Sequence, residues 1–171
     1  RVSITKYWDP KLSNEEMYDQ EELILNEMDV LLNDSSKLPV RSDVPVGAFL
    51  SGGADSSAVT AFASQYTSSK LETFHMDWCR VKGKLDEKGY AQLVADKYKT
   101  KHTIKAILDD DLIKLLPKMI WHLDEPLADG AFVPTYGLSS IAAQNVKVIL
   151  SGAGGDELFG GYGHYSHISL Y

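Results

Sequence analysis

The stretch VPVGAFLSGGADSSAV, residues 44–59, runs a short apolar segment into a group of glycines, hydroxyls and one acid. Gly52 and Gly53 permit positive φ angles and close approach of the backbone to a ligand. Consecutive backbone amides in such a loop form an anion-binding concavity, and the positive N-terminus of a following helix strengthens it. The pattern therefore predicts a phosphate-binding loop, with neutral donors available from Ser51, Ser56 and Ser57.

A second stretch, VKVILSGAGGDELFGGY at residues 146–162, repeats this arrangement further along the chain. Ser151 and Gly152 again follow an apolar run and precede an acid, Asp156. An acid beside phosphates needs a cation, and Mg²⁺ is bound jointly by carboxylate and phosphate oxygens. We therefore expect Asp55 and Asp156 to be the metal ligands and the catalytic groups of one shared Mg²⁺ site.

Other phosphate-binding motifs fit less well. The Walker A motif ends in Gly-Lys followed by Ser or Thr, and no Gly-Lys pair of this chain has that spacing. The dinucleotide fingerprint also fails, because Glu157 stands where its third glycine is required. Two simpler interpretations remain: an ordinary strand-to-helix turn at residues 51–53, and acids that merely favour a helix N-terminus at Asp156 and Glu157.

Apolar runs alternate with amphipathic segments along the chain, which predicts the elements that position these loops. Strands are expected over residues 46–50, 71–76, 102–108 and 146–150. Helices are expected over residues 56–64 and 134–144, and apolar faces indicate further helices within 17–31, 91–98 and 112–123. Pro117 should break or kink the last of these helices. Short continuous apolar strands between helices are typical of an α/β fold with a buried parallel sheet and helices on both faces. Ligands bind beyond the carboxyl ends of such strands, so both Ser-Gly loops can face one crevice.

The composition sets the class of protein. The chain has 171 residues, 44% of them hydrophobic, enough for one domain with a sizeable core. Its net charge of −7 argues against nucleic acid as the main partner. The single cysteine, Cys79, cannot form an internal disulfide, and no apolar run approaches the roughly 18 residues of a membrane span. We expect a cytoplasmic protein with no membrane or nucleic-acid partner.

SGGADSS resembles the pyrophosphate loop, or PP-loop, of the N-type ATP pyrophosphatases, which cleave ATP between its α- and β-phosphates and adenylate a substrate. LSGAGGDELFGGY is similar to the synthetase domain of the asparagine synthetase family, and so are KYWDP, SDVPVGAFLSGG, HLDEPLADGAFVPTYGLS and the Asp86-Glu87 pair. The resemblance covers the chain from about Tyr7 to Tyr162. It implies a fold like that of the adenine nucleotide alpha hydrolases, with ATP and Mg²⁺ as cofactors.

The resemblance also implies a reaction and a set of residues. A glutaminase domain supplies ammonia from glutamine, which displaces AMP from an adenylated carboxylate, typically aspartate, to give asparagine, AMP and pyrophosphate. The implied residues of the nucleotide site are those of the PP-loop (Ser51, Gly52, Gly53, Asp55, Ser56, Ser57), those flanking adenosine (Leu50, Met76) and those of the second loop (Ser151, Gly152). The implied acceptor-binding residues are Asp124, Glu125, Ala153, Gly154 and Gly155.

Two departures from the family pattern bear on the activity. Ala153 stands where asparagine synthetases often carry a glutamate that handles the acyl-adenylate and the amine. The family's catalytic lysine would lie beyond Tyr171, and no glutaminase domain is present, so we expect residues 1–171 to be a synthetase domain that is incomplete at its C-terminus and inactive alone. A different acceptor, in another PP-loop amidotransferase such as GMP synthetase, and a non-catalytic nucleotide-binding domain are the alternatives.

Several candidate residues also have simpler structural interpretations. Asp124 and Glu125 are suited to a turn beside Pro126, and Met76 is suited to the core. The histidines are expected at packing or surface positions rather than as metal ligands: His75, His102, His122, His164 and His167.

Overall fold

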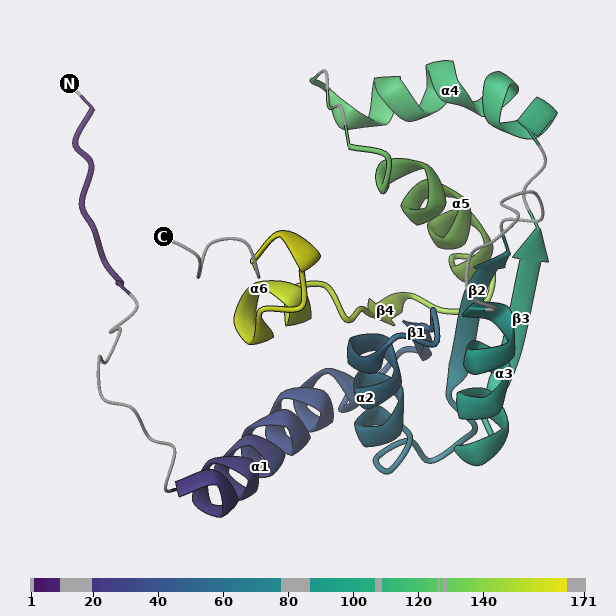
Figure 1. Ribbon diagram of the computed structural model, residues 1–171. Helices are drawn as coiled ribbons and strands as arrows, with labels where there is room; N and C mark the ends of the chain where they lie inside the picture. The colour runs from purple at the N-terminus through teal and green to yellow at the C-terminus, as the bar shows by residue number, and fades with distance from the viewer. Residues whose placement is uncertain are drawn as a thin grey trace.

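The computed structural model describes residues 2–9, 20–77, 87–106, 109–125, 127 and 129–165. Its elements follow one another as α1 (Glu21–Val40), β1 (Val46–Phe49), α2 (Ala54–Ala63), β2 (Glu72–Asp77), α3 (Glu87–Lys97), β3 (Lys101–Ala106), α4 (Asp109–Leu123), α5 (Phe132–Ala142), β4 (Val148–Leu150) and α6 (Gly155–Phe159). Figure 1 shows them in space. The alternation of strands and helices is the one that the apolar runs predict.

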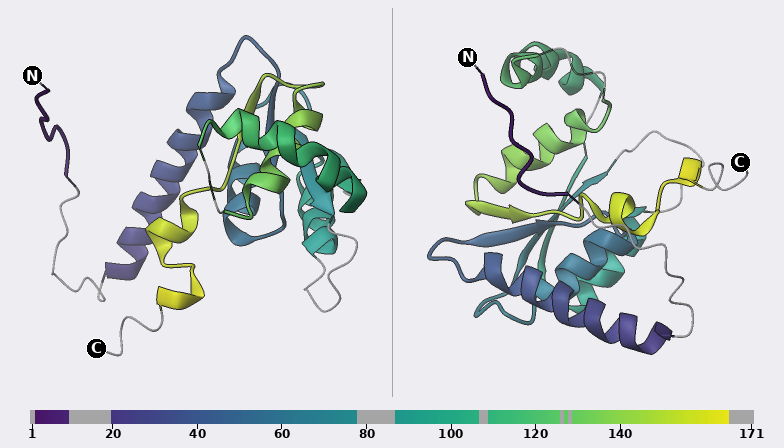
Figure 2. Two further views of the ribbon diagram at one scale, coloured as in Figure 1. Left: turned by 90° about the horizontal axis from the view of Figure 1, so that it is seen from above. Right: turned by 90° about the vertical axis from the view of Figure 1, so that its left-hand side faces the viewer.

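The strands form one parallel sheet in the order β3-β2-β1-β4. Helices α2 and α3 cover one face, with α1 packed on α2, and α5 covers the other face, with α4 packed on α5 (Figure 2). The predicted α/β class with helices on both faces is therefore confirmed. None of the described helices is both long and apolar enough to cross a membrane.

Side-chain alternation along the strands explains the two layers of the core. Successive residues of a strand point to opposite faces. Ala48 of β1 packs with Ala63 of α2 on one face, whereas Phe49 joins Phe74 and Ala142 of α5 on the other. Because β1 is covered on both faces, its sequence is a continuous apolar run rather than an alternating one.

The structure corrects one predicted element and adds another. A break or a kink was predicted at Pro117, and helix α4 continues through this residue, so the break does not occur. A proline removes one intrahelical hydrogen bond, and burial of Met119, which is 2% exposed, favours the continued helix. The short helix α6 was predicted only through Asp156 and Glu157, as acids that favour a helix N-terminus, and its bounds were not predicted because its five residues carry no apolar periodicity. The expected start of α1 near Met17 lies outside the described residues.

Gly47 of β1 provides a test of this packing. A Cβ atom there would lie 2.9 Å from the carbonyl oxygen of Glu72 and 3.0 Å from the Phe74 ring. We predict that Gly47→Ala lowers the free energy of unfolding by about 1–3 kcal/mol, measured by urea denaturation. The control is Gly130→Ala, whose Cβ would meet no atom within 4 Å; equal stability of the two variants would contradict the packing described.

Candidate functional site

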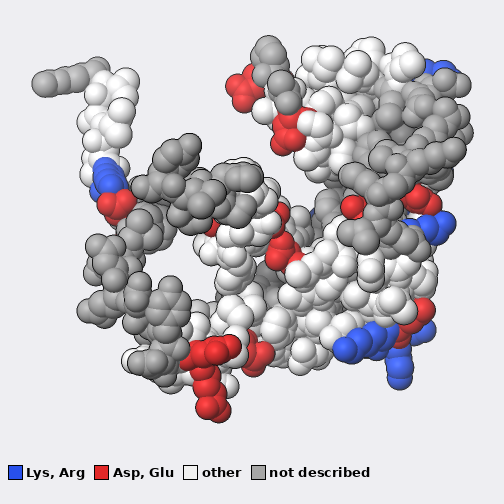
Figure 3. All heavy atoms as spheres, viewed as in Figure 1, with Lys and Arg blue, Asp and Glu red and all other residues white. Residues whose placement is uncertain are grey.

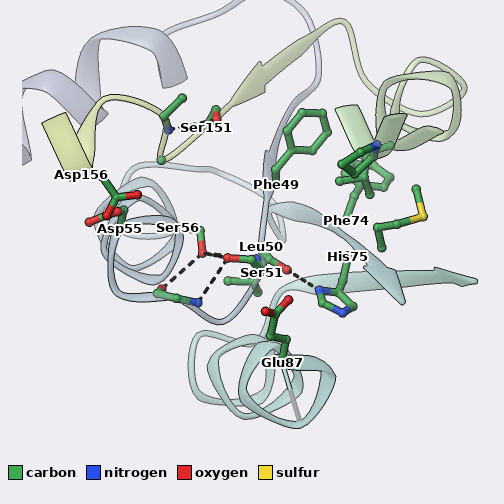
Figure 4. A pocket seen from close by; sticks show the side chains of 16 residues that line it. Phe49, Leu50, Ser51, Asp55, Ser56, Phe74, His75, Glu87, Ser151 and Asp156 are labelled. Atoms are coloured by element: carbon green, nitrogen blue, oxygen red, sulfur yellow. Dashed lines mark hydrogen bonds between the residues drawn. The ribbon is translucent and has the colours of Figure 1, made fainter. Parts of the chain in front are cut away.

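A pocket of about 350 Å³ lies at the carboxyl ends of β1, β2 and β4 (Figure 4). It is lined by Phe49, Leu50, Ser51, Gly53, Asp55, Ser56, Phe74, His75, Met76, Glu87, Pro134, Leu138, Ser151, Gly152, Ala153 and Asp156. Both Ser-Gly loops contribute to it, although one hundred residues separate Ser51 from Ser151. They meet because β1 pairs directly with β4, with Ala48 opposite Leu150.

Hydroxyl groups hold the first loop in a defined shape. The Ser51 and Ser56 hydroxyls are 2.9 Å apart, and Ser56 Oγ also accepts a hydrogen bond from the Ser51 amide at 3.2 Å. Ser51 Oγ in turn accepts from the Gly53 amide at 3.2 Å. The loop is thus organised by its own side chains before any ligand binds.

The backbone of the first loop requires glycine at its second position. Gly52 has φ +88°, and a Cβ atom there would lie 2.6 Å from the amide nitrogen of Ala91 in α3. The chain therefore turns tightly against α3 and enters α2 at Ala54. The amides of the first turn of α2 have no partner within their own helix, so they face the pocket edge as donors for an anion.

The second loop packs against the first through two glycines. A Cβ atom at Gly152 would lie 2.8 Å from the amide nitrogen of Ser56. A Cβ atom at Gly155 would lie 2.6 Å from Asp55 Oδ1. Any side chain at these positions would push the loops apart, and with glycine there Asp55 and Asp156 both line the pocket and point into the same part of it in Figure 4.

These two carboxylates have the surroundings of a cation site. Neither makes an ion pair or a side-chain hydrogen bond within the described part of the chain. No third His, Cys, Asp or Glu of the described residues joins them in a cluster. This donor set fits Mg²⁺, which proteins bind through one or two carboxylates while phosphate oxygens and water complete the shell.

Basic side chains are absent from the residues that line this pocket. In the face shown in Figure 3, Lys and Arg atoms gather mainly beyond the N-terminal end of β3 and the C-terminal end of α3, away from the pocket. Charge on a bound polyphosphate would therefore be balanced, among the described residues, by amides and a helix N-terminus together with a cation.

The opposite wall of the pocket is apolar. Met76 lines it, together with four side chains that the sequence placed only within predicted strands and a predicted helix: Phe49, Phe74, Pro134 and Leu138. Their spacing in the sequence could have identified them. Phe74 and Met76 are two residues apart and therefore lie on one face of β2, and Pro134 and Leu138 are about one helical turn apart. A flat apolar ring such as a base fits a wall of this kind.

His75 is a further pocket residue that sequence reasoning placed among packing or surface groups. Its ring is 3% exposed, and Nδ1 donates to the carbonyl oxygen of Leu50 at 3.0 Å. Leu50 also donates its amide to the carbonyl of Phe74 at 2.9 Å. Both the amide and the carbonyl of Leu50, the residue before the first loop, are therefore hydrogen-bonded to β2.

Not every implied residue lines the pocket. Gly52 and Ser57 support the first loop, since Ser57 donates its amide to Gly53 at 3.0 Å. Gly154, with φ +98°, and Gly155 shape the second loop. Asp124 and Glu125 follow the end of α4 and are not among the lining residues. Cys79, Asp86, Pro126 and His167 lie outside the described residues.

Three titratable groups near the site have shifted pKa values. Burial lowers the pKa of His102, and the nearby His75 lowers it further, while Asp96 and the bond to Thr73 act in the opposite direction. A hydrogen bond from Tyr162 lowers the pKa of Glu157 and raises the pKa of Tyr162 to about 12. Burial therefore favours the neutral form of His102.

Comparison with known proteins agrees with this geometry. The family model described as asparagine synthase matches residues 27–171. A Methanocaldococcus jannaschii protein provisionally named asparagine synthetase (glutamine-hydrolyzing) 2 is 45% identical over 156 residues, which cover 91% of this chain and 29% of that protein. Asparagine synthetase (glutamine-hydrolyzing) 1 of Bacillus subtilis is 37% identical over 151 residues, which cover 85% and 23%. The chain thus spans less than a third of the length of these relatives.

A solved structure shows the same fold. The NH3-dependent NAD synthetase from Campylobacter jejuni, determined in complex with the nitrate ion, superposes with a TM-score of 0.51 at 18% identity. The match covers 83% of this chain and 60% of that chain. This likeness shows the same α/β fold, a parallel sheet with helices on both faces.

The lowered pKa of His102 predicts a pH dependence of stability. As pH falls below about 6.5, the unfolded chain takes up a proton at this histidine before the folded chain does. Stability that is present above that pH is therefore lost as the pH falls toward the lower pKa of the folded state. We predict that His102→Asn reduces the drop in unfolding free energy between about pH 7 and pH 5, measured by urea denaturation; identical pH slopes in the two proteins would contradict this.

Proposed function

The chain belongs to the asparagine synthase family, and we propose that it forms the ATP-binding part of an enzyme that adenylates a carboxylate and converts it to an amide. The proposed acceptor is aspartate, and ammonia would displace AMP to give asparagine, AMP and pyrophosphate. The observation that carries the proposal is the convergence of two Ser-Gly loops, with Asp55 and Asp156, on one pocket.

The shape of the pocket supports ATP as the ligand. The first loop offers amides, serine hydroxyls and the N-terminus of α2 to the β- and γ-phosphates. The apolar wall around Phe74 and Met76 is suited to the adenine ring. Ser151 and Gly152 line the same pocket at the end of the neighbouring strand, and we assign them to the ribose and the α-phosphate.

Asp55 and Asp156 would hold Mg²⁺, which would neutralise charge on the departing pyrophosphate. The residues of the chain then act mainly by positioning. The serine network fixes the phosphate donors, His75 fixes Leu50, and the close contact of Gly152 with Ser56 fixes one loop against the other. Rate acceleration of this type comes from orientation and from charge stabilisation that is arranged in advance.

Ammonia would come from elsewhere in the full-length protein. The relatives are named as glutamine-hydrolysing and are more than three times longer than the matched region. We propose that residues 1–171 belong to the synthetase domain, that further segments complete it, and that a glutaminase domain supplies the ammonia. Asp124, Glu125, Gly154 and Gly155 stay proposed as acceptor-binding residues.

Ala153 favours a second candidate, an amidotransferase with another carboxylic acid as acceptor. This residue lines the pocket and has no group that can accept a proton. Its amide donates to Ser151 Oγ at 3.2 Å, so its place in the loop is that of a structural residue. The full-length protein should be incubated with ATP and each acid of a panel of carboxylic acids, and the acid that stimulates pyrophosphate release identifies the acceptor. If no acid gives pyrophosphate release, a non-catalytic nucleotide-binding domain is favoured.

The metal role of Asp55 can be tested on this chain by thermal unfolding. ATP with Mg²⁺ at about 100 times its dissociation constant should add about 2.7 kcal/mol to stability. We predict that Asp55→Asn removes the part of this gain that depends on Mg²⁺, while the melting temperature without ligand stays nearly unchanged because the two side chains have similar shapes.

Asp34→Asn is the matched control, because it makes the same change of charge at an exposed position of α1. It should leave the whole gain intact. Equal protection by ATP with and without Mg²⁺ in the unmodified chain would show that the assignment of Asp55 is wrong.

A further inference from the structure

The turn that closes α6 is tied to the two acids at the start of that helix. Gly160 ends α6 with φ 67°, and the amide of Gly161 donates to the carbonyl of Asp156 at 3.1 Å. The Tyr162 hydroxyl donates to Glu157 Oε1 at 2.7 Å. Gly161 and Tyr162, which follow the turn, are therefore hydrogen-bonded to Asp156 and Glu157, which begin the helix.

The Asp156 carboxylate occupies space that exists only because residue 161 is glycine. A Cβ atom at Gly161 would overlap Asp156 Oδ1 and lie 3.0 Å from Cγ. The Asp55 carboxylate has the same relation to Gly155, where a Cβ atom would lie 2.6 Å from Oδ1. Each acid of the pair thus occupies space that a glycine leaves open, and a side chain at that glycine would displace the carboxylate.

Aromatic neighbours hold the Tyr162 ring. It stacks on His164 with ring centroids 5.2 Å apart and meets Tyr165 edge-on at 5.5 Å. The phenol that binds Glu157 is therefore held by its own segment, although Tyr162 is 37% exposed. Neither Glu157 nor Tyr162 lines the pocket, so neither is placed to touch a ligand there.

We propose that Glu157, Gly161 and Tyr162 are positioning residues that hold the Asp156 carboxylate beside Asp55, ready for the divalent cation that accompanies the nucleotide. The proposal rests on the proposed function of the pocket. Two adjacent carboxylates repel each other, so a free Asp156 side chain would turn toward solvent in the absence of a cation. A turn that fixes this side chain in advance removes that reorientation from the cost of binding.

The test is the affinity of the 171-residue chain for ATP with and without Mg²⁺. The ratio of the two dissociation constants measures the metal-dependent gain, and the constant without Mg²⁺ reports whether the rest of the pocket is intact. Tyr162→Phe and Glu157→Ala should each reduce the ratio about 2- to 10-fold, the equivalent of one hydrogen bond. Glu157→Gln keeps an acceptor for the Tyr162 hydroxyl and should restore most of the ratio.

Gly161→Ala should reduce the ratio to the level of Asp156→Asn, because its methyl group takes the place of the carboxylate oxygen. Gly163→Ala is the matched control, since a Cβ atom there meets nothing within 4 Å and the ratio should not change. Binding without Mg²⁺ should be unchanged in Tyr162→Phe and Gly163→Ala, and it should not weaken in Asp156→Asn, which removes a negative charge beside the phosphates.

The possible outcomes distinguish a failure of this positioning role from a failure of the proposed nucleotide-binding function on which it rests. If Asp156→Asn removes the metal-dependent gain but Tyr162→Phe, Glu157→Ala and Gly161→Ala keep it, the positioning role is overturned and the nucleotide site stands. If Glu157→Gln loses as much as Glu157→Ala, the charge of Glu157 rather than its hydrogen bond is what matters, and the inference is also overturned. If the unmodified chain shows no metal-dependent gain, the metal assignment itself fails. Tyr162→Phe removes a single oxygen atom, so it remains informative even if Gly161→Ala does not fold.

Discussion

The parallel pairing of β1 with β4 is the interaction on which the site depends. Each strand taken alone ends in a flexible Ser-Gly loop with an acid a few residues later. With Ala48 opposite Leu150, the two strands end at the same edge of the sheet and both loops open into the same pocket. The pairing joins segments far apart in the sequence, and the buried contacts of Phe74, Ala142 and Val146 beside it supply the hydrophobic free energy that holds it.

Steric contact rather than attraction limits how closely the two Ser-Gly loops approach each other. Gly152 allows the second loop to reach the Ser56 amide, and Gly155 allows it to reach the Asp55 carboxylate. The result places two acids in one pocket that has no Lys or Arg among its lining residues. Unfavourable charge of this kind is expected at a binding site, because the ligand supplies the missing counter-charge.

The sequence was sufficient for the parts of the structure that local chemistry determines. The apolar runs predicted all the described strands to within about two residues, as is usual for element boundaries, and the two Ser-Gly motifs predicted where the pocket lies. It failed where tertiary packing decides the outcome. Pro117 stays within α4 because the helix is packed on α5, and His75 reaches the pocket because Leu50 turns its carbonyl toward β2. No local pattern contains either contact.

The pleat of β2 divides the site into its two chemistries. Phe74 and Met76 point to the face covered by α5 and contribute to the apolar wall, whereas His75, between them, points to the face covered by α3 and binds Leu50. The polar end of the pocket is built on the other side, from the loop after β1 and the N-terminus of α2. A shift of β2 by one residue would exchange the two faces, placing an imidazole in the apolar wall and removing the hydrogen bond that fixes Leu50. The register of Ala48 with Thr73 therefore sets the polarity of the pocket as well as the stability of the sheet.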